Sequence, residues 1–98
     1  MCIEFEYDEE KEALNIAKHG VSFEEARMVF FDPIRIDIFD AEHSVNEERW
    51  KVFGFAGWVL LMVSYTERAG VIRIISARKA TESEEEMYFY GYNTNCDN

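Results

Sequence analysis

At Asp32-Pro33 the hydrophobic period of the chain changes from helical to strand spacing, and this change restricts the fold more than any other feature of the sequence. Before it, the segments 9–19 and 22–31 carry helix signals. After it, between residues 34 and 79, apolar side chains recur every second residue, as they do in strands. We therefore expect helices first and then a sheet built from successive strands.

The first helix is predicted at residues 9–19, which follow Asp8 as the N-cap. Acidic residues fill its first turn, whereas Lys18 and His19 end it, which matches the helix dipole. Gly20 comes directly afterwards, where a glycine commonly stops a helix.

Two capping boxes predict where the other helices begin. Ser22 is followed three residues later by Glu25, and this helix should run to Phe31. Thr81 is followed three residues later by Glu84 and should open the last helix.

One strand is expected at residues 3–7, where apolar and acidic residues alternate. Four consecutive strands are expected at 34–40, 49–56, 58–66 and 71–79. The predicted fold class is α+β: an antiparallel sheet with the helices packed mainly on one face, in the order β-α-α-β-β-β-β-α. We expect a single domain over residues 1–92 and a polar tail at 93–98.

Composition narrows the functional classes. No apolar run approaches the roughly 20 residues of a membrane-spanning helix, so we expect a cytoplasmic protein with no membrane partner. Cys2 and Cys96 lie near opposite ends and are interpreted as reduced thiols. His19 and His43 are too few and too isolated to predict a zinc site, and no cofactor is expected.

The net charge of -10 hides a basic segment. Residues 1–48 hold four lysines and arginines against fourteen acids, and residues 80–98 hold five acids and no base. Residues 49–79 hold six basic residues against one glutamate. The local field decides whether a groove attracts an anion, so this segment predicts a phosphate-binding surface despite the overall charge.

The cations of the last strand raise a question of geometry. Arg73 and Lys79 are an even number of residues apart and should share a face, whereas Arg78 should lie opposite. Either a β-bulge re-aims one of these arginines, or one of them is structural. We expect Arg68 and Arg78 to lie at the binding groove.

Three separated motifs in this order resemble BrnT-type toxins: "EFEYDEEKEALNIAKHGVSFEEARMVFFDP", the His43-Ser44 segment with "EERW", and "SYTERAGVIRIISARKATESEEEMY". The resemblance covers about residues 5–88. It implies a RelE-like fold and a metal-independent endoribonuclease of a type II toxin–antitoxin system. It also implies neutralisation by a BrnA-like antitoxin, with DNA bound only through that partner.

Metal-independent RNA cleavage uses the RNA's own 2′-hydroxyl as the nucleophile. The protein must supply a proton acceptor, a proton donor and cations for the charge that develops on the phosphate, for which arginine is well suited. The expected catalytic residues are Lys18, His19, Arg68 and Arg78. The expected RNA phosphate ligands are Arg49, Lys51, Arg73 and Lys79.

Several alternatives remain open at this point. Lys18 and His19 also fit a simple helix C-terminus, and His43 is interpreted as a turn or solvated residue. Glu48 is a candidate base, and Tyr88 is a candidate for stacking on RNA or for proton transfer. A surface ion pair and a core tyrosine are the more common explanations of such residues. The whole protein could also be a non-catalytic docking module that uses the same basic strand face, or a mimic of nucleic acid. The nuclease interpretation requires the arginines to converge without each being neutralised by an acid of the chain.

Overall fold

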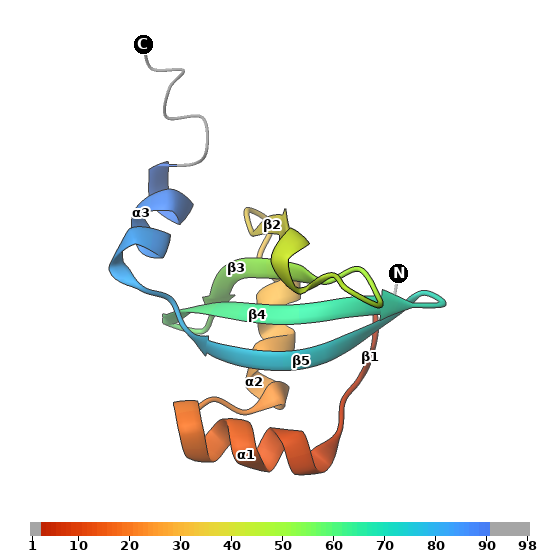
Figure 1. Cartoon of the computed structure of the whole chain (residues 1–98). Coiled ribbons are helices and arrows are strands. Elements are labelled where there is room, and N and C mark those ends of the chain that lie inside the picture. Colours follow the sequence, from red (N-terminus) through yellow and green to blue (C-terminus); the bar gives the residue numbers. More distant parts are fainter. Residues whose placement is uncertain (1–2, 91–98) are drawn as a thin grey trace.

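A computed structural model describes residues 3–90 of the chain, and it has the predicted α+β class and order of helices and strands (Figure 1). The strands are β1 (Glu4–Glu6), β2 (Ile36–Phe39), β3 (Trp50–Ala56), β4 (Val59–Arg68) and β5 (Val71–Lys79). The α-helices are α1 (Glu9–His19), α2 (Phe23–Arg27) and α3 (Glu82–Tyr90), and the 3-10 helices are η1 (Met28–Phe31) and η2 (Ala41–His43). Cys2, Cys96 and the predicted tail lie outside the described residues. None of the helices described is long and apolar enough to cross a membrane.

The strands form a five-stranded mixed sheet in the order β1-β5-β4-β3-β2. Strands β2 to β5 are antiparallel to their neighbours, as predicted. The departure from the antiparallel prediction is β1, which pairs in parallel with the first three residues of β5. The chain leaves β1 through the helices and re-enters the sheet at the opposite edge, so β5 arrives beside β1 running in the same direction.

Helices α1 and α2, with η1, cover one face of the sheet, which we call the core face. Its buried strand residues are Val52, Leu61, Val63, Tyr65, Ile74 and Ala77. The buried residues that the helical segments add are Val21, Phe23, Ala26, Val29 and Phe30. This cluster is the main hydrophobic core, and it leaves the other face of the sheet free for polar side chains.

A smaller apolar cluster lies on that other face, near the β3–β4 hairpin. Its buried residues are Phe53, Leu60, Met62 and Tyr88. The hydroxyl of Tyr88, in α3, donates to Asp32 Oδ2, which also accepts the backbone N–H of Phe55 at 2.9 Å. Helix α3 is therefore fastened separately from α1 and α2 and stands apart from them (Figure 1).

The capping signals form as the sequence predicts. Asp8 accepts hydrogen bonds from two backbone N–H groups of the first turn of α1, and Ser22 with Glu25 forms a reciprocal capping box. Gly20 ends α1 at φ 73°, a conformation that glycine adopts without strain. The second helix is shorter than predicted, because it tightens into a 3-10 turn after Arg27.

A single buried amide joins α1 to the sheet. Strand β1 covers only the start of β5, so no described strand pairs with the edge of β5 at Ala77. Asn15 fills the place of that partner: its Nδ2 donates to Ala77 O at 2.8 Å, and its Oδ1 accepts the Ala77 N–H at 3.1 Å. The same Nδ2 also donates to Val21 O at 2.8 Å. The side chain thus satisfies backbone groups that would otherwise be buried without partners.

Asn15→Ala is expected to destabilise the fold by about 2 kcal/mol, because it leaves a buried N–H and buried carbonyls unpaired. Urea unfolding with an unchanged slope is the measurement. The neighbouring Leu14→Ala is the control, since Leu14 is 69% exposed and should change the unfolding free energy by less than about 0.5 kcal/mol. Equal effects of the two variants would contradict the role of Asn15.

Candidate nucleic-acid interface

A β-bulge decides which face of the sheet carries the arginines of β5. The register of β4 and β5 shifts at Ser64/Tyr65, where β5 holds Ile75 as an extra residue. Arg73 and Arg78 are five residues apart and would lie on opposite faces of a regular strand. Their partners in β4 are four residues apart and share a face, so both arginines lie on the side away from the helices. The bulge expected as one alternative from the sequence is confirmed.

We call this side of the sheet the basic face. Lys51 pairs with Ser64, and Ser64 pairs with Ser76, which forms a polar row across the three central strands. Arg68 lies on the same face of β4, and Arg49 comes just before β3. The cations of the basic face are Arg49, Lys51, Arg68, Arg73 and Arg78.

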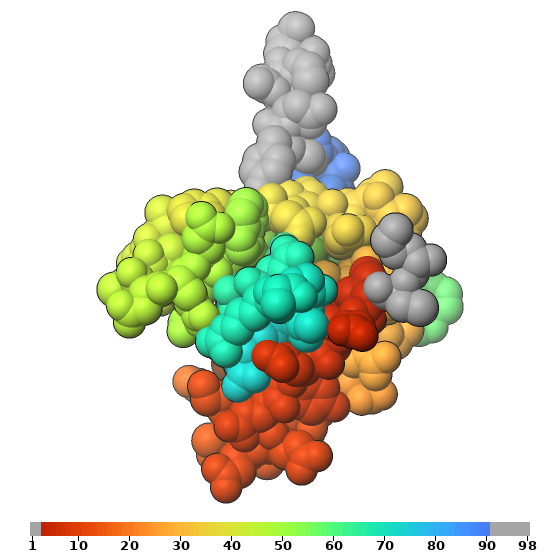
Figure 2. Space-filling view, turned by 90° about the vertical axis from the view of Figure 1, so that its right-hand side faces the viewer, coloured from red at the N-terminus to blue at the C-terminus, as the bar shows by residue number. Residues whose placement is uncertain are grey.

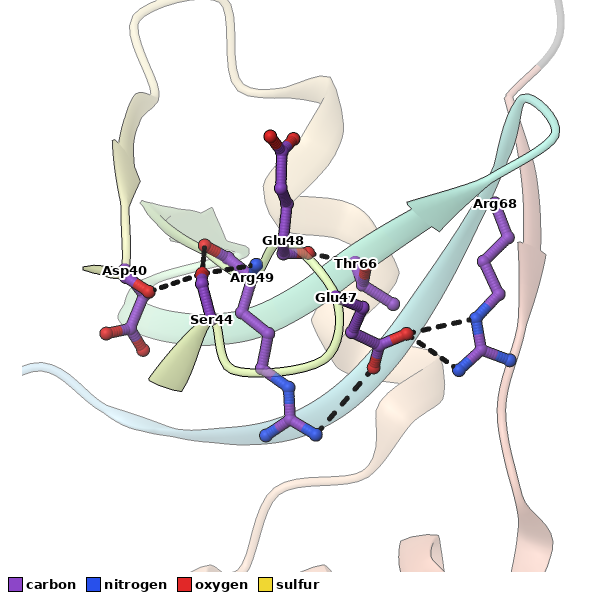
Figure 3. Close-up of polar contacts among 7 residues, drawn as sticks. All are labelled: Asp40, Ser44, Glu47, Glu48, Arg49, Thr66 and Arg68. Carbon is purple, nitrogen blue, oxygen red and sulfur yellow. Dashed lines mark hydrogen bonds and ion pairs between the residues drawn. The ribbon is translucent and has the colours of Figure 1, made fainter. Parts of the chain in front are cut away.

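The loop between β2 and β3 closes over the edge of this face (Figure 3). The backbone N–H of Asp40 donates to Arg49 O at 2.8 Å and joins the two ends of the loop. Inside it, Ser44 Oγ donates to Asp40 O at 2.6 Å and accepts the Arg49 N–H at 2.8 Å. Thr66 Oγ1 donates to Glu48 O at 2.6 Å and ties the loop to β4. In the space-filling view the loop is the yellow-green lobe beside the cyan β4–β5 turn (Figure 2).

The loop holds a histidine against a buried carboxylate. Asp40, 8% exposed, accepts the backbone N–H of His43 at 3.3 Å, and His43 Nδ1 lies 2.9 Å from Asp40 Oδ2. Burial disfavours the charged form of Asp40, but the hydrogen bonds from His43 outweigh it and lower the pKa of this carboxyl. An ionised carboxylate only accepts hydrogen bonds, so Nδ1 must be the donor and Nε2 of a neutral imidazole carries the lone pair. His43 is therefore oriented as a base.

Two adjoining hollows meet at His43 and Arg49. One, of about 260 Å³, is also lined by Asp40, Lys51 and the serines of the polar row. The other, of about 460 Å³, extends past Glu47 to Arg68. Lys51 makes no ion pair within residues 3–90. The hollows thus combine an oriented imidazole with a free ammonium group, which are the functional groups that phosphate chemistry requires.

The arginines of the basic face share this side of the sheet, but each already has an acidic partner. Glu47 lies 2.9 Å from Arg68 Nη2 and 3.7 Å from Arg49 Nη2 (Figure 3). Glu6 lies 3.1 Å from Arg73 Nη1. The expectation that the arginines would remain free of intramolecular acids is therefore wrong. Glu47 lies two residues before Arg49, where a local surface pair is an open alternative from the sequence. The Glu47–Arg68 and Glu6–Arg73 pairs join residues 21 and 67 positions apart, which no local sequence pattern predicts.

The fourth pair, Arg78 with Glu84, has the strongest geometry. Two parallel hydrogen bonds of 2.9 Å join the guanidinium to the carboxylate. The hydrogen bond from Arg78 lowers the pKa of Glu84 despite partial burial, and the hydrogen bond to Glu84 raises the pKa of Arg78. Glu84 also accepts the Thr81 N–H at 2.8 Å, so the predicted capping box of α3 and the ion pair use the same side chain.

Lys18, His19 and Lys79 are not brought together with the arginines. Lys18 and His19 end α1, and Val21, two residues later, is buried in the main core on the core face. Lys79 pairs with Leu61, which faces the same core. The sheet thus separates these three residues from the basic face, and their catalytic or binding roles remain predictions.

The structure also shows the surroundings of the two weaker candidates, Tyr88 and Glu48. Tyr88 is 7% exposed and hydrogen-bonded to Asp32, so its ring packs in the protein and offers no free face to a base. Glu48 is exposed, and its backbone carbonyl, not its carboxylate, makes the contact with Thr66. The alternative of a core tyrosine therefore fits Tyr88, whereas Glu48 forms no ion pair within residues 3–90 and its role as a base stays a prediction.

One group in the described part of the chain has the spacing of metal ligands. Potential donor atoms of Asp40, Glu42 and His43 lie within 4.8 Å of one another. Asp40 and His43 already hydrogen-bond each other, so a metal ion here would compete with that bond.

The interpretation of His43 as a turn or solvated residue agrees with its exposed position in η2, but sequence reasoning missed its contact with Asp40. The available signal was the spacing of Asp40 and His43, since an aspartate reaches the N–H three residues ahead when it caps a turn. That spacing predicts the backbone contact, but the closure of the loop over the polar row depends on long-range bonds to β4.

A family model described as "Ribonuclease toxin, BrnT, of type II toxin-antitoxin system" matches residues 7–84. The match includes every cation of the basic face, the loop with Asp40 and His43, and Glu84. No curated protein matches the chain.

Glu84→Gln is expected to lower the unfolding free energy by about 1 kcal/mol at pH 7, because glutamine keeps the capping box but loses the charge that binds Arg78. The pKa of Glu84 is below its ordinary value of 4.5, so its contribution is complete above pH 4.5 and is lost as the pH falls through the folded-state pKa. The difference from the wild type, measured by urea unfolding, should therefore shrink in that acidic range.

Glu86→Gln is the matched control, since Glu86 is an exposed acid of the same helix without an ion pair in residues 3–90. A difference that stays constant between pH 7 and pH 4, or an equal effect of Glu86→Gln, would contradict the assignment.

Proposed function

The chain belongs to the BrnT family of ribonuclease toxins of type II toxin–antitoxin systems, and from this premise we propose that it is a metal-independent endoribonuclease that cuts RNA on the basic face. The observation that carries the proposal is His43, held by the ionised Asp40 and lining one hollow with Lys51 and Arg49. These residues supply a proton acceptor, a proton donor and cations without a metal ion.

In the proposed reaction, His43 Nε2 removes the proton from the 2′-hydroxyl, and the 2′-oxygen attacks the adjacent phosphorus. The bond from phosphorus to the 5′-oxygen breaks, and the Lys51 ammonium donates a proton to that oxygen. Arg49 stabilises the charge on the phosphoryl oxygens. The products are a 2′,3′-cyclic phosphate and a 5′-hydroxyl end, so atoms and charge balance without a further reactant.

Binding of RNA must compete with the carboxylates that occupy the arginines. The Arg68–Glu47 and Arg73–Glu6 pairs are substantially exposed, and exposed pairs contribute only about 0 to 1 kcal/mol. A phosphodiester can therefore replace these carboxylates at small cost. Arg78 becomes available only when its bidentate pair with Glu84 also opens. Arg73 and Arg78 are five residues apart, or about 15 Å along a strand, so they would then contact different phosphates of one bound strand.

Membership of the family also supports proposals about the protein's partner and about the origin of its fold. A type II system contains a protein antitoxin, and we propose that the antitoxin is BrnA-like and that DNA is contacted only through it. We also propose that the sheet and its helices are related to the RelE-like ribonucleases.

His43→Gln is expected to lower the cleavage rate by about 10²- to 10⁴-fold, which is the usual contribution of an acid–base group. The assay follows purified protein acting on single-stranded RNA in EDTA, with end-group analysis for the cyclic phosphate. His19→Gln is the matched control and should retain cleavage. If His19→Gln lost cleavage and His43→Gln retained it, the proton transfer would instead be assigned to His19 at the end of α1. Loss of wild-type cleavage in EDTA would contradict metal independence.

A docking module without catalysis is the second candidate, and it is favoured by the acidic partner that each arginine of the basic face already has. The two functions predict different results for Arg78→Ala. A nuclease should lose at least tenfold in cleavage rate while far-UV circular dichroism remains unchanged, because a phosphate ligand is lost. For a docking module, the wild type itself should show no cleavage above the His43→Gln background, and Arg78→Ala should weaken only partner binding.

A further inference from the structure

An apolar groove lies between η1 and α3, outside the proposed nuclease site. It has a volume of about 610 Å³, and its apolar lining residues are Met28, Phe31, Pro33, Ile34, Phe55 and Phe89. Ile34 is 67% exposed and Phe89 62% exposed. The polar groups in the groove are already satisfied, since Asp32 accepts the Tyr88 hydroxyl and the Phe55 N–H. Such a surface is suited to apolar side chains, not to chemistry.

The walls of the groove are held in place by packing. A Cβ atom on Gly54 of β3 would lie 2.9 Å from Val29 Cγ1, so the glycine lets η1 lie directly on the strand. On the other wall, Phe55 contacts the rings of Tyr88 and Phe89, with centroids 5.5 and 6.1 Å apart. The groove therefore exists before any partner binds.

One rim of the groove is acidic. Glu85 and Glu86 lie one helical turn before Phe89, and Glu82 lies two turns before it. All three glutamates are therefore on the side of α3 that carries Phe89. All three are exposed, and none forms an ion pair within residues 3–90. Helix α3 has no basic residue at all.

We propose that this groove binds a cationic amphipathic helix of the antitoxin, whose apolar side chains fill the groove and whose lysines or arginines face the acidic rim. The proposal rests on the toxin–antitoxin function. Helices that bind grooves in this way present anchors at i, i+3, i+4 and i+7. Charge complementarity selects this occupant: a second copy of the chain would bring two acidic rims together, and residues 91–98 carry an aspartate and no basic residue.

The same helix links the groove to the nuclease site. Glu84 and Tyr88 lie one turn apart on the inner side of α3, where Glu84 binds Arg78 and Tyr88 binds Asp32. A partner seated against Phe89 holds α3 in this position and thus keeps Arg78 neutralised. Docking in the groove therefore inhibits RNA binding without covering His43.

The first test uses two synthetic 14-residue helical peptides with leucine at the anchor positions, one with lysine and one with glutamate at the remaining positions. Fluorescence anisotropy should show the lysine peptide binding the wild type at least tenfold more tightly than the glutamate peptide. Ile34→Asp should weaken binding of the lysine peptide at least tenfold. Leu14→Asp is the matched control, because it makes the same change at an equally exposed leucine of α1 and should leave binding unchanged. Equal binding of both peptides, or equal loss in both variants, would overturn the proposal.

The second test distinguishes the occupants through oxidation of Met28, which is 51% exposed in the free groove. The lysine peptide should protect Met28. Protection in the free protein at every concentration would place the chain's own tail there, and protection that grows with protein concentration would place a second copy there. Either result would overturn the proposal.

The third test uses the cognate antitoxin, which we expect an adjoining reading frame to encode. Ile34→Asp should cleave RNA like the wild type but need at least tenfold more antitoxin for neutralisation, and the antitoxin should inhibit Glu84→Gln less than the wild type. Normal neutralisation of Ile34→Asp would overturn the docking site. If the wild type without antitoxin did not cleave RNA, the proposed function would be contradicted. The peptide-binding and Met28-protection tests would still show whether the groove binds a cationic helix.

Discussion

The extra residue in β5 is the constraint on which the candidate site depends. Without the bulge at Ile75, Arg73 and Arg78 would point to opposite sides of the sheet, and one of them would be directed at the helices. With it, the N-terminal half of β5 keeps Ile74 in the main core while the C-terminal half keeps Ala77 there. A single inserted residue thus reconciles the packing of the core face with a basic surface on the other face.

On the basic face, carboxylates of the chain occupy the arginines that would bind RNA phosphates under the proposed function. The chain carries twenty acids against ten lysines and arginines, and part of that excess is folded back onto the arginines from the loop, β1 and α3. Lys51 remains free of such pairing within the described residues and lies in the same hollow as the Asp40–His43 pair. Under the proposed function, these carboxylates would compete locally with RNA phosphates for the arginines, and the acidic composition would not simply repel RNA from the whole molecule.

Helix α3 lies between the basic face and the apolar groove beside η1 and contacts both. Its inner side holds Arg78 through Glu84, and its outer side presents Phe89 to the groove beside η1, next to glutamates that form no ion pair within residues 3–90. Its attachment to the sheet relies on the smaller apolar cluster and on the hydrogen bond from Tyr88 to Asp32. A helix fastened at so few points is a suitable element through which a partner can act on a neighbouring cation.

The amino-acid sequence by itself determined the features that depend on neighbouring residues. The capping of α1 by Asp8, the capping box of Ser22 and Glu25, and the order of helices and strands all follow from local hydrogen bonding and periodicity. The motifs were also sufficient to indicate the family, which the matched residues 7–84 confirm.

Only the tertiary structure decided which of these residues meet. The parallel pairing of β1 and the ion pairs Glu47–Arg68 and Glu6–Arg73 join segments that lie far apart in the chain. The separation of His19 from the arginines likewise depends on which face of the sheet α1 covers. The orientation of His43 depends on a loop closed through Ser44 and tied to Thr66. Contacts of this kind are set by the packing of the whole sheet, because a strand's own period predicts its two faces but not what lies across them.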